Sequence, residues 1–283
     1  MMILVAVDGS EGSAAALRWA RRFADQMGAS MGAVRAWEYP SSAALPGGPS
    51  LRGQDEVTAE VTSELTRFLR DELAEGAEGV EAIVEPGVAD LAVLRAAERW
   101  RADLIVVGRR GLGAVAGRLL GSVSRRVVEG ATCPVAVIPS PLGAHEGPVV
   151  VGVDGSASAA AAVEWATEVA LALSSPMVVV HAVSYELPGS PYSFGDAMDR
   201  AGQAIAEEQS RPPREAGVEV RTVVRTLDPR ALIPETADEL DARLVVVGSR
   251  GAGPIASLLM GSTASYLAER CDHPTVLVPR PPP

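Results

Sequence analysis

The sequence contains no lysine, and its charge is strongly one-sided. All 25 basic residues are arginine, and 36 acidic residues outnumber them, which gives a formal net charge of −11. Proteins that bind nucleic acid need clustered cations against the phosphate backbone, so this balance argues against nucleic acid as a partner. It does not exclude a single small anion that is held by backbone amides.

Cysteines and long apolar runs are equally scarce. Cys133 and Cys271 form no CxxC pair, so we expect no disulfide framework and interpret both as packing residues. No apolar run approaches the roughly 20 residues that span a bilayer, which argues against a membrane protein. The first eight residues, MMILVAVD, lack the basic segment of a signal peptide. We therefore expect a cytoplasmic protein, and the composition is typical of a GC-rich bacterial genome.

The sequence is, however, rich in repetition. The segment ILVAVDGS at residues 3–10 returns as VVVGVDGS at 149–156, and ADLIVVGRRGLG at 102–113 returns as ARLVVVGSRGAG at 242–253. The segment CPVAVIP at 133–139 likewise returns as HPTVLVP at 273–279. Matched blocks in the same order predict a duplicated domain. We place the first domain at residues 1–140, a linker rich in turn formers at 141–147, and the second domain at 148–283.

Each copy alternates the signals of strands and helices. In the first copy, short apolar runs at 3–7, 31–37, 80–84, 104–107 and 135–138 predict strands that are buried on both faces. Helical patterns occupy 10–28, 55–75, 90–101 and 122–129, with Ser10 or Ser13 as the first N-cap and Gly28 as the first C-cap. This alternation predicts α/β domains, each with a mostly parallel five-stranded sheet and helices on both faces.

A glycine-rich loop follows the fourth predicted strand of each copy. The two loops read Gly108-x2-Gly111-x9-Gly121-Ser122 and Gly248-x2-Gly251-x9-Gly261-Ser262. In both, the last glycine precedes a helix, whose N-terminus presents unpaired N–H groups and a partial positive charge. Such a segment can bind a phosphate without a lysine, and serine hydroxyls can add a donor. Tight turns are the plainer interpretation of a single glycine pair, but the pattern occurs twice with the same spacing.

Two better-known phosphate motifs do not fit. A Walker A loop requires a lysine, which this chain lacks. A dinucleotide fingerprint, GxGxxG, is also absent, because the pair Gly111-x-Gly113 has no glycine three residues later. The expected site lies beyond the carboxyl ends of the strands, as in other open α/β sheets.

The glycine pattern after an apolar strand, the opening VAVDGS and the closing CPVAVIP together resemble the ATP-binding class of the universal stress protein family. The resemblance covers nearly the whole chain, as two consecutive domains. It implies Rossmann-like domains of the adenine nucleotide alpha hydrolase type and an adenine nucleotide, ATP, as the ligand. Mg²⁺ could accompany the phosphates, although no dedicated metal cage is recognisable.

The resemblance also assigns residues to two nucleotide sites. These are Val7, Asp8, Ala36, Gly108, Arg110, Gly111, Gly121, Ser122 and Val123 in the first half, and Val153, Asp154, Ala182, Gly248, Arg250, Gly251, Gly261, Ser262 and Thr263 in the second. The aspartates match the nucleoside end and the alanines match positions against the adenine. The plainer interpretation of each Asp-Gly-Ser is a strand-end turn. The arginines could reach over the phosphates, although loop arginines are usually solvated.

One loop departs from the repeat. The first copy has Pro86-Gly87-Val88 after its third strand, and the second has Thr226-Leu227-Asp228-Pro229. This loop lies near the expected ligand edge, which allows the two sites to differ in affinity. His145, His181 and His273 lack the spacing of metal ligands, so we expect no metal site.

The last predicted strand of each half, 135–138 and 275–278, is expected at a sheet edge, which invites pairing. The resemblance implies pairing of the two halves within the chain and leaves a homodimer open. The leading hypothesis is an ATP-binding regulatory or stress-response protein with two nucleotide sites per chain and no catalytic residues. The alternatives are a slow ATP-hydrolysing or nucleotidyl-transferring enzyme and an interaction module that is independent of ATP.

Overall fold

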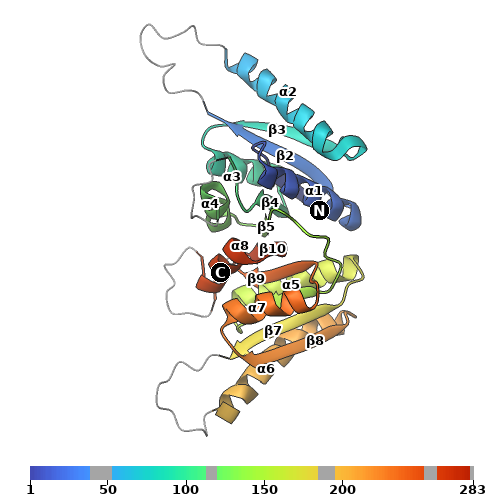
Figure 1. Ribbon diagram of the computed structural model, residues 1–283, viewed down its shortest axis with the longest axis vertical. Coiled ribbons are helices and arrows are strands. Elements are labelled where there is room, and N and C mark those ends of the chain that lie inside the picture. Colours follow the sequence, from blue (N-terminus) through green and yellow to red (C-terminus); the bar gives the residue numbers. More distant parts are fainter. Residues whose placement is uncertain (39–52, 113–119, 184–194, 252–259, 281–283) are drawn as a thin grey trace. The chain divides into compact units, whose positions relative to one another are not determined.

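The computed structural model describes residues 1–38, 53–112, 120–183, 195–251 and 260–280. The chain divides into two compact units, Met1–Pro141 and Leu142–Pro283. In both units strands and helices alternate along the chain (Figure 1). The α/β class that the sequence predicts is therefore confirmed, and each unit is described below by itself.

The first unit contains five strands and four α-helices among its described residues. In chain order these elements are β1 (Met2–Ala6), α1 (Glu11–Met27), β2 (Ser30–Trp37), α2 (Gln54–Leu73), a short 3-10 helix η2 (Ala74–Ala77), β3 (Val80–Pro86), α3 (Ala89–Trp100), β4 (Leu104–Gly108), α4 (Ser122–Gly130) and β5 (Val135–Ile138).

The second unit repeats the same order of elements. They are β6 (Val149–Gly152), α5 (Ala157–Ala172), β7 (Met177–Val183), α6 (Gly195–Glu215), β8 (Val220–Thr226), α7 (Pro229–Glu239), β9 (Leu244–Gly248), α8 (Ser262–Arg270) and β10 (Thr275–Val278).

The strand order of each sheet places a switch point at its centre. In the first unit the order is β3-β2-β1-β4-β5, and in the second it is β10-β9-β6-β7-β8. Within each unit, neighbouring strands run parallel. The chain moves outward from β1 to β3 and then returns to β4 on the other side of β1. Because crossovers are right-handed, this reversal places α1 and α2 on one face and α3 and α4 on the other.

The first helix of each unit begins and ends at signals that are visible in the sequence. The Ser10 hydroxyl accepts the N–H of Ser13 at 3.1 Å, and the Ser156 hydroxyl accepts the N–H of Ala159 at the same distance. These bonds satisfy N–H groups that a helix leaves open at its start. Gly28 ends α1 in the left-handed region, with φ at 61°, which glycine adopts without steric cost.

The cores lie on both faces of the central strands. Every residue of β4, β5, β6 and β10 is buried, which explains why these strands are continuous apolar runs. In the part of the chain that the structure describes, no helix has both the length and the apolar character that crossing a membrane requires.

Candidate functional site

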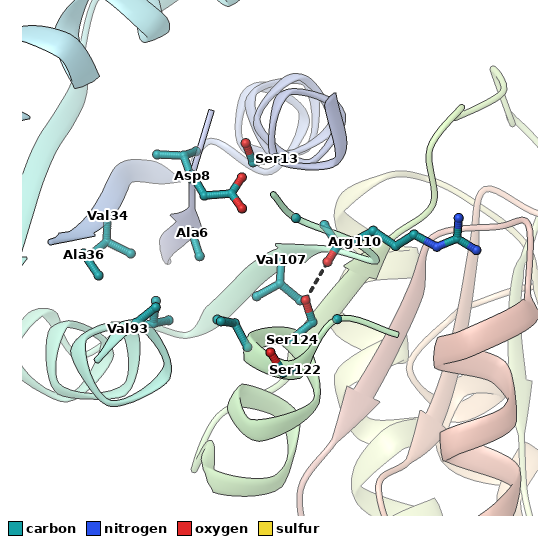
Figure 2. A pocket seen from close by; sticks show the side chains of 16 residues that line it. Ala6, Asp8, Ser13, Val34, Ala36, Val93, Val107, Arg110, Ser122 and Ser124 are labelled. Carbon is teal, nitrogen blue, oxygen red and sulfur yellow. Dashed lines mark hydrogen bonds between the residues drawn. The ribbon is translucent and has the colours of Figure 1, made fainter. Parts of the chain in front are cut away.

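A pocket opens in the first unit at the carboxyl ends of β1 and β4, where the strand order reverses (Figure 2). Ligands of open α/β sheets bind at such a switch point. The pocket is lined by Ala6, Val7, Asp8, Ser13, Val34, Ala36, Ala89, Val93, Val107, Gly108, Arg110, Gly111, Gly121, Ser122, Val123 and Ser124.

All nine residues that the sequence assigns to the first site line this one pocket. They come from the ends of β1, β2 and β4 and from the start of α4, so the fold brings together segments that are far apart in the chain. The strand periodicity could have added Val34, which shares a face of β2 with Ala36. Ala89 and Val93 lie four residues apart on α3, and nothing in the sequence shows that this helix face points into the pocket.

The Asp8 carboxylate joins the turn after β1 to the glycine-rich loop. Its Oδ1 accepts the backbone N–H of Ser10 at 3.0 Å and the Ser10 hydroxyl at 2.6 Å, and its Oδ2 accepts the N–H of Leu112 at 2.9 Å. Partial burial acts to raise the pKa of Asp8, but these hydrogen bonds outweigh it and lower the pKa below its ordinary value. Asp8 is therefore a carboxylate at neutral pH.

The glycines of the loop allow backbone and carboxylate to approach each other closely. A Cβ on Gly111 would lie 2.3 Å from Asp8 Oδ2, and a Cβ on Gly108 would lie 2.6 Å from the carbonyl carbon of Gly12. Both distances are shorter than any ordinary contact, so these two positions require glycine for packing. Gly121 is different, since its φ is −61° and the nearest atom to an added Cβ is 3.5 Å away.

The N-terminus of α4 forms the second wall of the loop. Gly121 is the N-cap residue, and no side chain caps this helix. The N–H of Gly121 donates to the carbonyl oxygen of Arg109 at 2.8 Å, which joins the two ends of the glycine-rich segment. The buried Ser124 hydroxyl donates to the carbonyl oxygen of Gly108 at 2.7 Å and ties α4 to the end of β4. Ser122 lies at the first position of the helix, where its hydroxyl borders the pocket.

The side chains in Figure 2 divide the pocket into a polar and an apolar part. Val34, Ala36 and Val93 form an apolar wall, whereas Ser122 and Ser124 lie at the start of α4 and Ser13 lies on α1. The side chain of Arg110 extends away from Asp8, Val93 and Ser122. Only the backbone and the base of this residue therefore border the pocket, and the guanidinium is not directed over it.

The predicted residues of the second unit lie on the elements equivalent to those of the first. Val153 and Asp154 follow β6, Ala182 lies in β7, Gly248 ends β9, and Gly261, Ser262 and Thr263 form the start of α8. Asp154 Oδ1 accepts the N–H of Ser156 at 3.0 Å, as Asp8 does from Ser10. The N–H of Gly261 donates to the carbonyl oxygen of Ser249 at 2.8 Å. Arg250 and Gly251 are the last described residues before 260, and a Cβ on Gly251 would lie 2.7 Å from Asp154 Oδ2.

The lining residues of the pocket in the first unit include no histidine or cysteine. His181 is buried and its Nδ1 lies 2.9 Å from the carbonyl oxygen of Val153, whereas His273 contacts the Asp238 carboxylate at 2.8 Å. Burial raises the pKa of the Cys133 thiol to about 11. Within the described ranges, no group of three or more histidine, cysteine or acidic residues is arranged to hold a metal ion.

Comparison with known proteins relates the sequence of this chain to one family. The model of the universal stress protein family matches residues 1–139 and again residues 147–279. Universal stress proteins of two strains of Mycobacterium tuberculosis are 33% identical over 298 residues, which cover 97% of this chain and 95% of theirs. One from Mycolicibacterium smegmatis is 31% identical over 291 residues, with 98% and 96% covered.

A solved structure matches the whole chain as well. The crystal structure of a universal stress protein from Archaeoglobus fulgidus covers 99% of this chain and 98% of its own, with a TM-score of 0.67 and 23% sequence identity. At this identity the likeness supports the fold.

Proposed function

The chain belongs to the universal stress protein family, and from that premise we propose that it is an ATP-binding regulatory or stress-response protein with one nucleotide site in each unit. The observation that carries the proposal is the pocket at the switch point of the first unit. There a glycine-lined loop and the N-terminus of α4 meet an apolar wall within one cavity.

The two parts of the pocket suit the two parts of a nucleotide. The glycine loop and the uncapped N-terminus of α4 offer backbone N–H groups to phosphates. Val34, Ala36 and Val93 offer an apolar surface to a flat base. Asp8 is ionised, so phosphates would avoid it and a sugar hydroxyl would donate to it. These preferences orient the ligand with its base against β2 and its phosphates towards α4.

The residues that line the pocket suit nucleotide binding better than ATP hydrolysis. Asp8 is the one acidic residue among the described lining residues. Its lowered pKa makes it a weak base, whereas an efficient general base has a pKa near the working pH. If Mg²⁺ accompanies ATP, its ligands would be phosphate oxygens and water, because one carboxylate does not make a cage. We therefore propose at most slow ATP hydrolysis.

The direct test is to denature freshly purified protein and to identify the released nucleotide by chromatography and mass spectrometry. The proposal expects ATP, with up to two molecules per chain. In parallel, Gly121→Val should weaken ATP binding of the first site by at least about tenfold, because the added side chain enters the pocket where the backbone tolerates it.

Gly53→Val is a matched control for that variant. Gly53 is also an N-cap residue without a side-chain cap, its φ and ψ of −58° and 146° are close to the −61° and 150° of Gly121, and an added Cβ meets no atom within 4 Å. It should leave ATP affinity unchanged. Absence of bound nucleotide, together with no binding on titration of the wild-type protein, would refute the proposal and favour an interaction module. Dimerisation stays a prediction that light scattering tests.

A further inference from the structure

The two units have the same order of strands and α-helices, but they differ at two places beside the glycine loop where a ligand would bind. We propose that the two nucleotide sites are unequal and that the first unit holds the tighter one. This inference rests on the proposed function, that both units bind an adenine nucleotide. It depends on Gly12 against Ser158 and on the start of α3 against the start of α7.

The first difference lies in the opening turn of α1 and α5. Gly12 follows the capping Ser10 by two residues, and Ser158 follows Ser156 by the same spacing. A Cβ on Gly12 would lie 2.0 Å from the carbonyl oxygen of Arg110, so the loop backbone packs directly against this glycine. In the second unit the space is filled, because Ser158 carries a Cβ. The carbonyl of Arg250 therefore cannot take the position that the carbonyl of Arg110 takes.

The orientation of this carbonyl determines where the next N–H points. A trans peptide is planar, and its C=O and N–H point in opposite directions. The Arg110 carbonyl is turned towards Gly12, which is not a lining residue, whereas Gly111 lines the pocket. The N–H of Gly111 consequently points away from Gly12 and is available to an anion in the pocket. Because Ser158 blocks the same arrangement, the N–H of Gly251 is displaced from that direction.

Ser158 also places a buried hydroxyl group beside the loop. It is 2% exposed, and its hydroxyl has no hydrogen-bond partner among the described residues. Its Cβ lies 2.6 Å from where a Cβ on Gly248 would be, so the side chain packs against the first glycine of the second loop. Burying an unpaired hydroxyl costs free energy. The serine thus adds no favourable contact that would offset the altered loop.

The second difference lies at the other edge of the pocket. In the first unit α3 begins with Ala89, which lines the pocket, and its N-cap Val88 makes no side-chain cap. In the second unit Asp228 caps α7, where it accepts the N–H of Arg230 at 2.8 Å and pairs with the guanidinium. Those hydrogen bonds lower the pKa of Asp228, so it stays charged at neutral pH. At these positions the second unit therefore has the Asp228–Arg230 ion pair and Pro229, which lacks an N–H, where the first unit has Val-Ala-Asp at 88–90.

Both differences weaken the binding of a negatively charged nucleotide to the second unit. One displaces a backbone donor of the glycine loop, and the other replaces the backbone N–H of Ala89 with Pro229, which has none. The loss of one hydrogen bond corresponds to about fivefold in affinity. We expect the second site to bind ATP at least about fivefold more weakly than the first.

Isothermal titration with ATP in the presence of Mg²⁺ tests this expectation on the full chain, with each site silenced in turn. Gly261→Val leaves the first site and Gly121→Val leaves the second, since both glycines occupy N-cap positions with negative φ. The Gly261→Val protein should retain the tighter dissociation constant. Adding Ser158→Gly to the Gly121→Val protein should strengthen ATP binding by about threefold or more, because it restores the space against α5. Circular dichroism confirms that each variant is folded.

The outcomes separate this inference from the proposed function. Equal dissociation constants in the two silenced proteins, or a tighter second site, would overturn the inequality and leave the two-site proposal standing. No binding by the wild-type chain would overturn the proposed function. A second variant carries Asp228→Val, Pro229→Ala and Arg230→Asp. If neither this variant nor Ser158→Gly changes the dissociation constant of the weaker site, the structural cause is wrong.

Discussion

A pair of facing residues in the second unit provides a stringent test of how its core is packed. In the first unit, Ala6 at the end of β1 lies with Val93 of α3 in the pocket lining. The equivalent residues of the second unit are Gly152 and Ile233. A Cβ on Gly152 would lie 2.6 Å from Cδ1 of Ile233 and 3.0 Å from Cγ1 of Val247. The extra methyl group of Ile233 therefore takes the space that the Ala6 methyl group takes in the first unit.

Because Ile233 already fills this space, adding a methyl group at Gly152 is expected to overpack the core. Gly152→Ala forces its Cβ against two buried side chains, since Ile233 and Val247 are each 4% exposed. Overpacking of this kind costs about 1–3 kcal/mol. Ile233→Val alone removes a buried methyl group and costs about 0.5–1.5 kcal/mol. The double variant reproduces the first unit, so we expect it to be more stable than Gly152→Ala alone, with a coupling energy of about 1–3 kcal/mol.

Equilibrium urea unfolding of the four proteins in this cycle gives the coupling energy, provided that a common slope fits all four curves. Hydrogen exchange measured by mass spectrometry then locates the change. The amides of β6 and α7 should exchange faster in Gly152→Ala, whereas those of β1 and α3 serve as an internal control. A Gly152→Ala protein as stable as the wild type, or one that Ile233→Val does not rescue, would refute this account of the packing.

Two further predictions concern single titratable groups. Asp8→Asn should destabilise the first unit by about 1 kcal/mol at neutral pH, after allowance for its partial exposure, because the amide cannot accept from Ser10 and Leu112 as the carboxylate does. Since the folded pKa of Asp8 is lowered, this contribution to stability is present above the ordinary pKa near 4 and is lost as the pH falls through the folded value. Urea unfolding should therefore show a smaller difference in stability between the two proteins at pH 3 than at pH 7. Cys133 should resist iodoacetamide at pH 8 in the folded protein and react more readily as the pH approaches its pKa of about 11, with both cysteines alkylated in urea as the control. Site mapping by mass spectrometry that shows rapid alkylation of Cys133 at pH 8 would contradict this prediction.

The sequence predicted the fold and the loop because both depend on patterns that are local. Continuous apolar runs such as that of β4 indicate a strand buried on both faces, and the first two glycines of each loop mark positions where a Cβ cannot fit. Among the described glycines of the first unit, Gly12 has the shortest such distance, yet it gave no signal, because the opening turn of a helix accepts many small residues. Its importance depends on the Arg110 carbonyl, which reaches it only in the folded unit.

Other features could not be predicted for the same reason. The direction of the Arg110 side chain is set by the folded loop, and loop arginines have no preferred direction in sequence (Figure 2). Val93 enters the pocket because α3 packs beside β1 and β2, which only the tertiary contacts show. The change at Asp228 was visible as a departure from the repeat, but its ion pair with Arg230 and the cap that it makes required the structure.

The hydrogen bond between Asp8 and the N–H of Leu112 has a consequence for the growing chain during synthesis. The two residues lie 104 positions apart, and the pocket also needs the start of α4 beyond them. A nascent chain that has emerged only as far as β3 contains the part of the apolar wall that lies on β2, but neither Val93 nor the glycine loop. Formation of the pocket must therefore wait for a long-range closure, which is among the slower events of folding. A ligand that binds this pocket would select chains in which the first unit is already complete, and it would stabilise them by mass action before the second unit has finished folding.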